Sequence, residues 1–308
     1  MLSDHYLRVK KILGGPRANS FKVTLQMLFS RPTSAFGMLI VILYIAIAII
    51  DQVHPELFGI HGDIGTLVPN FLHPVPLPPS RKYPLGTTYP GINLLTGIIK
   101  AIRIDVAVSF FIVLVGAALG MLLGVYAAFR GGIFDEIIMR LTDIVFSLPF
   151  LVIVIAAGFF IPDGRSFKIL VIILIIVWWP TYARVARGQA LSIKNLSYVE
   201  AAKACGVSST KTIFKHILPN TMAPVLVQIS LDVGTVMLLM ASLAFLGFLP
   251  AGGYFAELGY LVNIGIPYFI DGYWWTMVFP SLTIMLWALS VNMIGDGLRD
   301  ALDPKLRR

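Results

Sequence analysis

Charged residues and cysteine are scarce in this sequence. Of its 308 residues, 13% are Asp, Glu, Lys or Arg and 57% are hydrophobic, and Cys205 is the single cysteine. Soluble domains carry roughly 25% charged residues, so this deficit excludes an ordinary soluble domain and indicates an integral membrane protein. A lone cysteine cannot form an intrachain disulfide, which excludes the disulfide-stabilised scaffolds of small secreted proteins.

Motifs that bind nucleotides or metals are also missing. No G-x-x-x-x-G-K-[ST] string occurs, so the chain has no recognisable phosphate-binding loop of its own. His54, His61 and His73 are too widely spaced to indicate a metal site, and no nucleophile–base pair stands out in the apolar stretches. We therefore expect no cofactor, no metal ion and no enzyme active site in this chain. No A-x-A-like site follows the first apolar stretch, so no cleavable signal peptide is predicted.

The hydrophobic residues gather in six stretches, which polar or basic residues separate. A helix that crosses the hydrocarbon core of a bilayer needs about 20 apolar residues. We therefore predict an all-α membrane protein with six transmembrane helices. The predicted spans run over residues 35–50, 105–129, 134–161, 167–182, 222–249 and 275–298.

Basic residues are distributed unevenly between the two ends of these spans. Of the 24 Lys and Arg residues, 18 belong to one end and only 6 to the other. The positive-inside rule assigns the basic end, with both chain termini, to the cytoplasm. We therefore expect the protein in the plasma or inner membrane of a cell. The same rule explains the net charge of +8 without a nucleic-acid partner.

The predicted organisation has five parts. They are a cytoplasmic N-terminus (1–34), the first transmembrane helix (35–50), an external proline-rich loop (51–103), a core of five helices (104–299) and a cytoplasmic tail (300–308). In the N-terminal part, the spacing of Phe21, Leu25 and Leu28 predicts a short helix, which Pro32 ends. We expect this helix to lie in the interface with membrane lipid.

The external segments leave alternatives open. Residues 51–100 contain eight prolines, which prevent long helices, but Leu57 and Phe71 give the loop apolar side chains to bury. An ordered cap and a disordered insertion both fit this composition. Residues 252–269 alternate small and aromatic residues, which fits a short helix near the pore mouth or a lid. Trp274 and Trp275 are typical of an aromatic belt at the membrane interface.

Three glycines recur at four-residue spacing in the second predicted span: Gly116, Gly120 and Gly124. Glycines on one helix face let another backbone approach closely, and such approach helps helices associate in a membrane. We therefore predict that a second helix packs tightly against this face.

Between the fourth and fifth spans, residues 197–219 form an unusually polar insert, which we call the coupling segment. Ser197 and Glu200 have capping-box spacing, so a helix is predicted to start there. Ala201 and Ala202 make that helix slim, and Gly206 is placed to end it in a left-handed cap. Ser208 or Ser209 can cap a second helix, and Pro219 marks the entry to the next span. We expect a partner protein to bind this slim helix and to displace the flanking spans.

Several motifs together resemble a known family. Glu200, Ala201, Ala202, Gly206, Leu218 and Pro219 match the EAA signature of permease subunits in binding-protein-dependent ABC importers. YPLGT, MRLTDIVFSLP, FLGF and GDGLRDALDPKLR are similar to the C-type permease of the dipeptide/oligopeptide importers, and the resemblance covers about residues 20–308. His216, where isoleucine is frequent, fits the peptide branch. Residues 86–93 depart from that pattern, because they lack the charged GTDELGRD-like string.

The resemblance implies a type I ABC importer permease fold with a cytoplasmic coupling helix. It also implies partners: a second homologous permease, two cytoplasmic ATPases that hold ATP and Mg²⁺, and an external solute-binding protein. The residues implied to dock the ATPase are Ser197, Glu200, Ala201, Ala202, Gly206, Leu218 and Pro219. Glu200 could pair with Ser197 in the capping box, reach a basic residue on the ATPase, or do both.

Two carboxylates in the spans invite a functional interpretation. Asp232 lies near the middle of the fifth span, where a carboxylate costs roughly 2.5–3.5 kcal/mol on insertion scales. It either lines the solute path or bonds to a neighbouring helix, and the sequence favours neither. Asp143 lies close to Arg140, so an ion pair between them is predicted.

The leading hypothesis is therefore a pore-forming permease subunit of an ABC importer for short peptides. The first alternative is the same machine with another cargo, a di- or oligosaccharide or nickel. The second alternative is a proton-coupled secondary transporter that uses Asp232 as its proton site and needs no ATP.

Overall fold

The protein is described by a computed structural model. The described residues are 26, 28–58, 66–161, 166–248 and 254–302. They form helices α3 (Pro32–Val53), η1 (Pro55–Phe58), α4 (Leu94–Arg130), α5 (Gly132–Ser147), α6 (Phe150–Phe160), α7 (Phe167–Ile193), α8 (Ser197–Ala204), α9 (Ser209–Thr212), a π turn (Ile213–Ile217), α10 (Leu218–Phe245), α11 (Leu258–Ile270) and α12 (Trp275–Leu302), and strands β1 (Thr87–Thr88) and β2 (Ile92–Asn93). The predicted all-α class is confirmed. The predicted interfacial helix falls largely on residues outside this range, as does the end of the tail.

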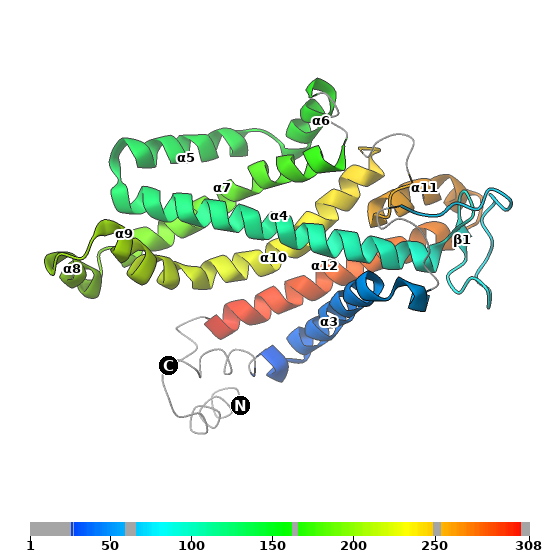
Figure 1. Cartoon of the computed structure of the whole chain (residues 1–308), viewed down its shortest axis with the longest axis horizontal. Helices are drawn as coiled ribbons and strands as arrows, with labels where there is room; N and C mark the ends of the chain where they lie inside the picture. Colours follow the sequence, from blue (N-terminus) through cyan, green and yellow to red (C-terminus); the bar gives the residue numbers. More distant parts are fainter. Residues whose placement is uncertain (1–25, 27, 59–65, 162–165, 249–253, 303–308) are drawn as a thin grey trace.

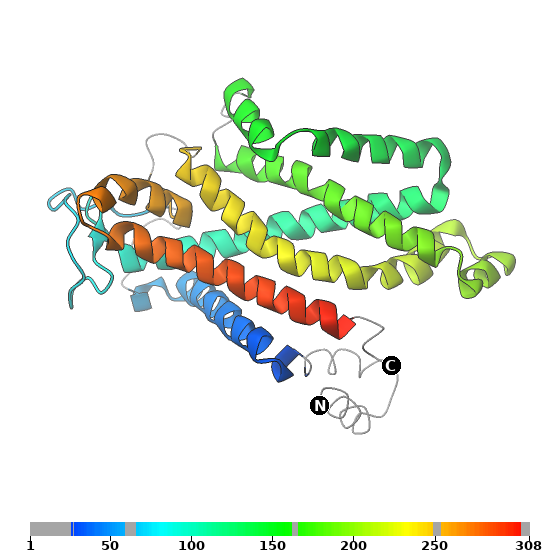
Figure 2. The same ribbon diagram turned by 180° about the vertical axis from the view of Figure 1, so that it is seen from behind.

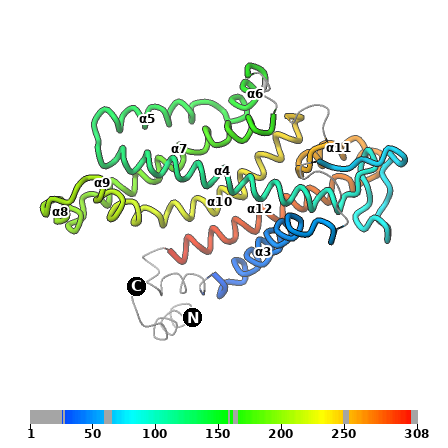
Figure 3. The backbone as a smooth tube through the Cα atoms, in the orientation of Figure 1, coloured from blue at the N-terminus to red at the C-terminus, as the bar shows by residue number. Residues whose placement is uncertain are grey.

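The long helices run side by side along one axis (Figure 1; Figure 3). α4 packs against α7, α10 and α3, while α12 packs against α10, α11 and α3. The coupling helices α8 and α9 lie at one end of the bundle, and β1 and α11 lie at the other, as the view from behind also shows (Figure 2). The two ends of the bundle therefore carry different structures.

Five helices among the described residues are long and apolar enough to cross a membrane, and a sixth crossing is counted if α5 and α6 form one bent span. The prediction of a single helix over 134–161 is wrong, because the chain turns by 86° between α5 and α6. Pro149 explains the break. A residue before proline is pushed out of the helical region, and Leu148 has φ −100° and ψ 131°.

Several helices extend beyond the predicted hydrophobic spans. α4 begins at Leu94, so residues 94–103 are helical and do not belong to the external loop; the Asn93 side chain caps it by accepting from Leu95 N at 3.1 Å. α7 continues to Ile193 rather than ending at 182, and α10 begins at Leu218 rather than at 222, although it ends earlier than predicted, at Phe245 rather than at 249. Hydrophobic runs mark only the part of a helix that lies in lipid, so helix that continues into water is missed.

Residues 66–93 form an ordered cap over one end of the bundle. β1 and β2 pair antiparallel with Thr88 opposite Ile92, and Leu67 N donates to Tyr254 O at 2.7 Å. The interpretation as a disordered insertion is wrong for this part of the loop. Trp275 is also buried, and its indole donates to Thr87 O at 3.1 Å. Trp275 therefore anchors the cap, so its assignment to an aromatic belt is wrong.

The glycine face of α4 lies against α7, as its spacing predicts. A Cβ atom at Gly120 or Gly124 would overlap the backbone carbonyl oxygens of Trp179 and Ala183, respectively, whereas one at Gly116 would lie 3.4 Å from Trp178 Cβ. The two helix backbones therefore touch at Gly120 and Gly124 and diverge slightly toward Gly116. This contact fixes the position of α7, the helix that leads into the coupling segment.

Candidate functional site

The coupling segment projects from one end of the bundle as α8 and α9 (Figure 1). α8 follows the end of α7 after a three-residue connection, Lys194–Leu196. α9, the π turn and α10 run on without a break, so residues Ser209–Phe245 form one continuous helix. Within α8, which is described throughout, Val199 alone is buried, and Glu200 and Ala201 are exposed. A slim, accessible helix is thus attached directly to two membrane spans.

The start of α8 differs from the prediction. Its N-cap is Leu196, whose side chain has no capping oxygen, and Ser197 is already the first helical residue. The capping-box prediction for Ser197 and Glu200 is therefore wrong. The Glu200 N–H, which the Ser197 hydroxyl was expected to bind, donates instead to Leu196 O at 3.1 Å.

The end of α8 agrees with the prediction. Gly206 has φ +77°, a left-handed conformation that suits glycine because it has no Cβ. Gly206 N donates to Lys203 O at 2.9 Å and Val207 N donates to Ala202 O at 3.1 Å. These two bonds are the Schellman motif, which satisfies the last carbonyl groups of the helix. Gly206 thus closes α8 at a defined residue.

The second helix of the coupling segment is not separate from the next span. Ser208 caps it, accepting from Lys211 N at 3.4 Å, but Pro219 does not interrupt it. Proline has no N–H to donate. In the turn before Pro219 the bonding widens, and Leu218 N–H donates to Ile213 O. Leu218 and Pro219 begin α10, which agrees with the prediction that Pro219 marks the entry to the next span. The second helix of the coupling segment continues into that span without a break.

Side chains tie α8 to the bases of the spans. Asn220, at the start of α10, donates to the Tyr198 hydroxyl at 3.3 Å and to His216 O at 2.6 Å. Lys203 Nζ lies 5.1 Å from the centre of the Phe129 ring, at the end of α4. α8 is therefore accessible on one side and held against α4 and α10 on the other.

The neighbouring ends of α5 and α7 are joined by ion pairs. The predicted pair of Asp143 with Arg140 is wrong: Asp143 accepts from Arg184 of α7 at 2.6 Å, while Arg140 lies 3.8 Å from Glu136 on its own helix. Asp143 and Arg140 are close in the sequence, but Arg184 of α7 lies closer to Asp143 in the structure. The sequence does not show that α7 is a neighbour of α5.

Asp232 is a buried residue of α10 on the side that faces α7. Its side chain accepts a hydrogen bond from Gln228 Nε2 at 2.9 Å, and the Tyr182 hydroxyl and Trp178 indole of α7 lie against it. Only 7% of the residue is exposed. The hydrogen bond is therefore within α10, and Asp232 Oδ2, the Tyr182 hydroxyl and the Trp178 indole have no hydrogen-bond partner among the described residues. The burial of Asp232 against α7 favours an internal position over one that lines an open path.

Two buried carboxyl groups at the opposite end of the bundle were missed by the sequence analysis. Asp105 Oδ2 accepts from Leu258 N at 3.0 Å and Glu257 Oε2 from Tyr260 N at 2.6 Å, so both bind the first turn of α11. Their other oxygens, Asp105 Oδ1 and Glu257 Oε1, have no hydrogen-bond partner among the described residues. Burial raises the pKa of the Glu257 carboxyl to about 7.

A buried ion pair joins α3 to α4 near the same end. Arg103 Nη1 lies 2.8 Å from Asp51 Oδ2, and the Asp51 side chain is inaccessible. Acidic residues inside apolar stretches are a visible signal in the sequence, since each needs a partner. The sequence does not name the partners.

The described residues include no group of three or more His, Cys, Asp or Glu that could hold a metal ion. His54 Nδ1 lies 2.9 Å from Glu56 Oε1, and His61 lies outside the described residues.

Comparison with known proteins identifies the family. The family described as the inner membrane component of binding-protein-dependent transport systems matches residues 120–308, which include the whole coupling segment. The chain belongs to this family. The permease is therefore a multi-pass membrane protein and a transport component rather than an enzyme in its own right.

Relatives of the permease carry specific names. It is 37% identical over 232 residues to the dipeptide transport system permease protein DppC of Bacillus subtilis strain 168, covering 75% of this chain and 72% of that one. It is 39% identical over 229 residues to the probable D,D-dipeptide transport system permease protein DdpC of Escherichia coli strain K12, covering 74% and 76%. It is 36% identical over 232 residues to the oligopeptide transport system permease protein OppC of Bacillus subtilis strain 168, covering 75% and 74%.

Proposed function

We propose that this permease forms half of the pore of an ATP-driven importer of short peptides. In this proposal a second, homologous permease completes the pore, and an external binding protein delivers the peptide. Two cytoplasmic ATPases bind ATP and Mg²⁺ and dock on the coupling segment. The permease itself binds no cofactor.

The geometry of α8 is the observation that carries the proposal. An exposed helix is closed at its far end by Gly206 and is joined by short connections, of three residues to α7 and of four to the helix Ser209–Phe245, to two membrane-spanning helices. A force applied to α8 therefore reaches α7 and α10 without being absorbed by a loose loop. No step in a purely passive or proton-driven carrier requires such a helix.

The end of the bundle that carries α8 is proposed to face the cytoplasm. Lys203, Lys211 and Lys215 lie there, which agrees with the excess of basic residues on cytoplasmic segments. The cap formed by residues 66–93 and α11 then faces outward, where a binding protein would dock.

The peptide cargo follows from the relatives, which are named for transport of dipeptides, D,D-dipeptides and oligopeptides. Another relative, 35% identical over 235 residues, is the glutathione transport system permease protein GsiD of Pectobacterium atrosepticum. These names favour peptides over the sugar and nickel alternatives. The internal contacts of Asp232 leave the proton-coupled alternative without an exposed proton site.

Docking of the ATPases can be tested by reversing one charge on α8. Glu200→Lys should weaken co-purification of the ATPases with the permease and lower ATP-dependent peptide uptake in proteoliposomes. Glu56→Lys is the matched control, because Glu56 is also exposed but lies on η1 at the opposite end of the bundle. Equal loss in both variants, or in neither, would contradict docking at α8.

A further inference from the structure

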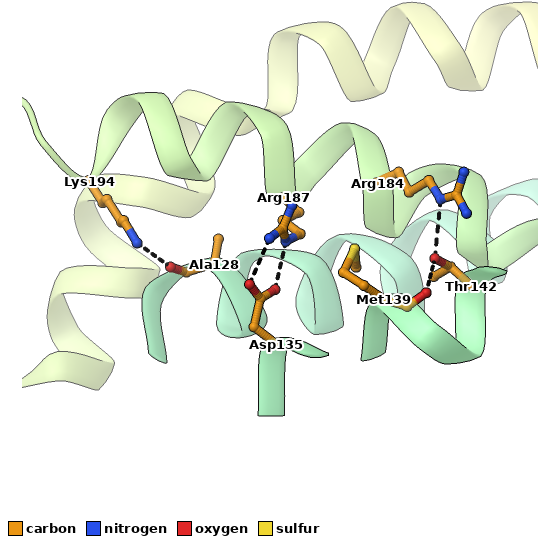
Figure 4. A network of polar contacts seen from close by, with 7 residues as sticks. All are labelled: Ala128, Asp135, Met139, Thr142, Arg184, Arg187 and Lys194. Atoms are coloured by element: carbon orange, nitrogen blue, oxygen red, sulfur yellow. Dashed lines mark hydrogen bonds and ion pairs between the residues drawn. The ribbon is translucent and has the colours of Figure 1, made fainter. Parts of the chain in front are cut away.

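Two arginines of α7 hold α5 at two separate points. Arg187 donates two parallel hydrogen bonds to Asp135, from Nε at 2.6 Å and from Nη2 at 2.7 Å (Figure 4). One turn earlier, Arg184 donates to Asp143 at 2.6 Å and to the Thr142 hydroxyl at 3.1 Å. We call Asp135, Asp143, Arg184 and Arg187 the clasp.

The clasp spans most of the length of α5. Asp135 lies in the first turn of this 16-residue helix, and Asp143 lies about one turn from its end at Ser147. A helix that is held at two points more than two turns apart cannot pivot about either one. The clasp therefore fixes the direction of α5 as well as its position.

Apolar packing contributes little to this attachment. Within α5, which is described throughout, burial is confined to Ile138 and Thr142. The Pro149 break at its far end, where the chain turns by 86°, leaves α5 without a straight continuation into α6. Besides its connection to α4 at Gly131 and the contact of the Phe134 ring with Tyr126, α5 is thus held by directional polar contacts to α7.

The clasp lies directly next to the coupling segment. α7 continues for less than two turns beyond Arg187 to Ile193, and α8 begins at Ser197. Lys194, in the connection, donates to Ala128 O at 2.8 Å, which ties the same end of α7 to α4 (Figure 4). A displacement of α8 therefore passes through the short connection Lys194–Leu196 into the last turns of α7 and reaches Arg187 there. It also reaches the end of α4 at Phe129, which Gly131 joins to α5.

We propose that the clasp carries the movement of α8 into α5 and so couples ATP hydrolysis to rearrangement of the pore. Its four members are positioning residues that act through α5 and do not bind the cargo. This proposal rests on the proposed function, in which the ATPases act at α8. A paired Arg–carboxylate contact suits the role because its planar, bidentate geometry transmits direction as well as distance.

The test compares transport with ATP consumption in the same sample. The permease is reconstituted in proteoliposomes with its second permease, its ATPases, its binding protein and a dipeptide. Arg187→Ala should lower the peptide imported per ATP hydrolysed by roughly fivefold or more, the lower range of coupling between protein sites, while the ATPases stay bound. Arg140→Ala is the control, since Arg140 pairs with Glu136 within α5 and, among the described residues, forms no ion pair with a second helix.

Conservative variants separate coupling from stability. Arg187→Lys keeps the charge but loses the bidentate contact, so its coupling ratio should fall between those of the wild type and Arg187→Ala. If Arg187→Ala does not assemble, Arg187→Lys and Asp135→Asn provide the same measurement. A wild-type ratio in all assembled clasp variants, with only a lower melting temperature, would overturn the proposal. Failure of the wild-type permease to bind the ATPases would instead refute the proposed function.

Discussion

The contact between α4 and α7 supports a graded prediction at its three glycines. An added Cβ at Gly120 would lie 2.7 Å from Tyr182 Cβ and 2.8 Å from Ala183 N, and one at Gly124 would lie 2.9 Å from the Ala183 carbonyl carbon. These separations are too short for carbon atoms, so α7 would have to move. At Gly116 the nearest atom is 3.4 Å away, which is an ordinary contact.

The expected magnitudes follow from two opposing effects. Overpacking a close-packed contact costs about 1–3 kcal/mol, while replacing glycine by alanine inside a helix recovers roughly 1 kcal/mol. Gly120→Ala and Gly124→Ala should therefore destabilise the permease by up to about 2 kcal/mol. Gly116→Ala should be neutral or stabilising by up to about 1 kcal/mol.

Thermal unfolding of the detergent-purified permease measures this series, with each variant scanned at one rate in one detergent. The melting temperature should fall for Gly120→Ala and Gly124→Ala and should hold or rise for Gly116→Ala. A rise for all three variants would show that α7 does not touch α4 at these glycines, and the route from α8 into the bundle would then need another support.

Three further predictions concern single residues. Gly206→Ala should destabilise α8 by about 1–2 kcal/mol, because a positive φ is unfavourable for alanine. The control Gly188→Ala, at an exposed helical glycine, should stabilise α7. Hydrogen exchange measured separately in α7 and α8 distinguishes the two effects. The pKa of the Glu257 carboxyl is raised from its ordinary 4.5 to about 7. The protonated carboxyl group therefore stabilises the folded permease at acid pH, and this stabilisation is lost as the pH rises from 4.5 through 7. The free energy of unfolding should fall by roughly 3 kcal/mol over that range. Glu257→Gln should flatten that part of the pH–melting profile, and an unchanged slope would contradict the assignment. Asp232→Asn should leave the rate of peptide uptake unchanged, because its contacts are internal; a large loss of uptake at wild-type stability would restore Asp232 as a lining residue.

Hydrophobic runs predicted most of the architecture. They located the long helices α3, α4, α7, α10 and α12, because a lipid environment imposes a minimum length of apolar sequence. They failed at Pro149, since hydropathy records how deep a residue lies but not the direction of the chain. The four-residue glycine spacing predicted the close contact on α4, because helical geometry alone puts these positions on one face.

The candidate site could be predicted only where it depends on local backbone rules. Gly206 was predicted to close α8 because a left-handed helix end favours glycine. The start of α8 and the clasp were not predicted. Arg187 and Asp135 are separated by 52 residues and Asp105 and Leu258 by 153, so only the packing of the helices brings them together. The sequence shows that such charges need partners but does not identify them.

Docking of the ATPases on α8 is the central claim, and Cys205 provides a direct probe of it. Cys205 is the single cysteine of the chain and is exposed at the end of α8, where it forms the C-cap. The measurement is the rate at which a maleimide labels this chain, read by its mass, in the permease alone and in the complex with its ATPases. Labelling of Cys205 is expected to slow markedly when the ATPases bind. Equal labelling rates in a complex that hydrolyses ATP and imports peptide would contradict it.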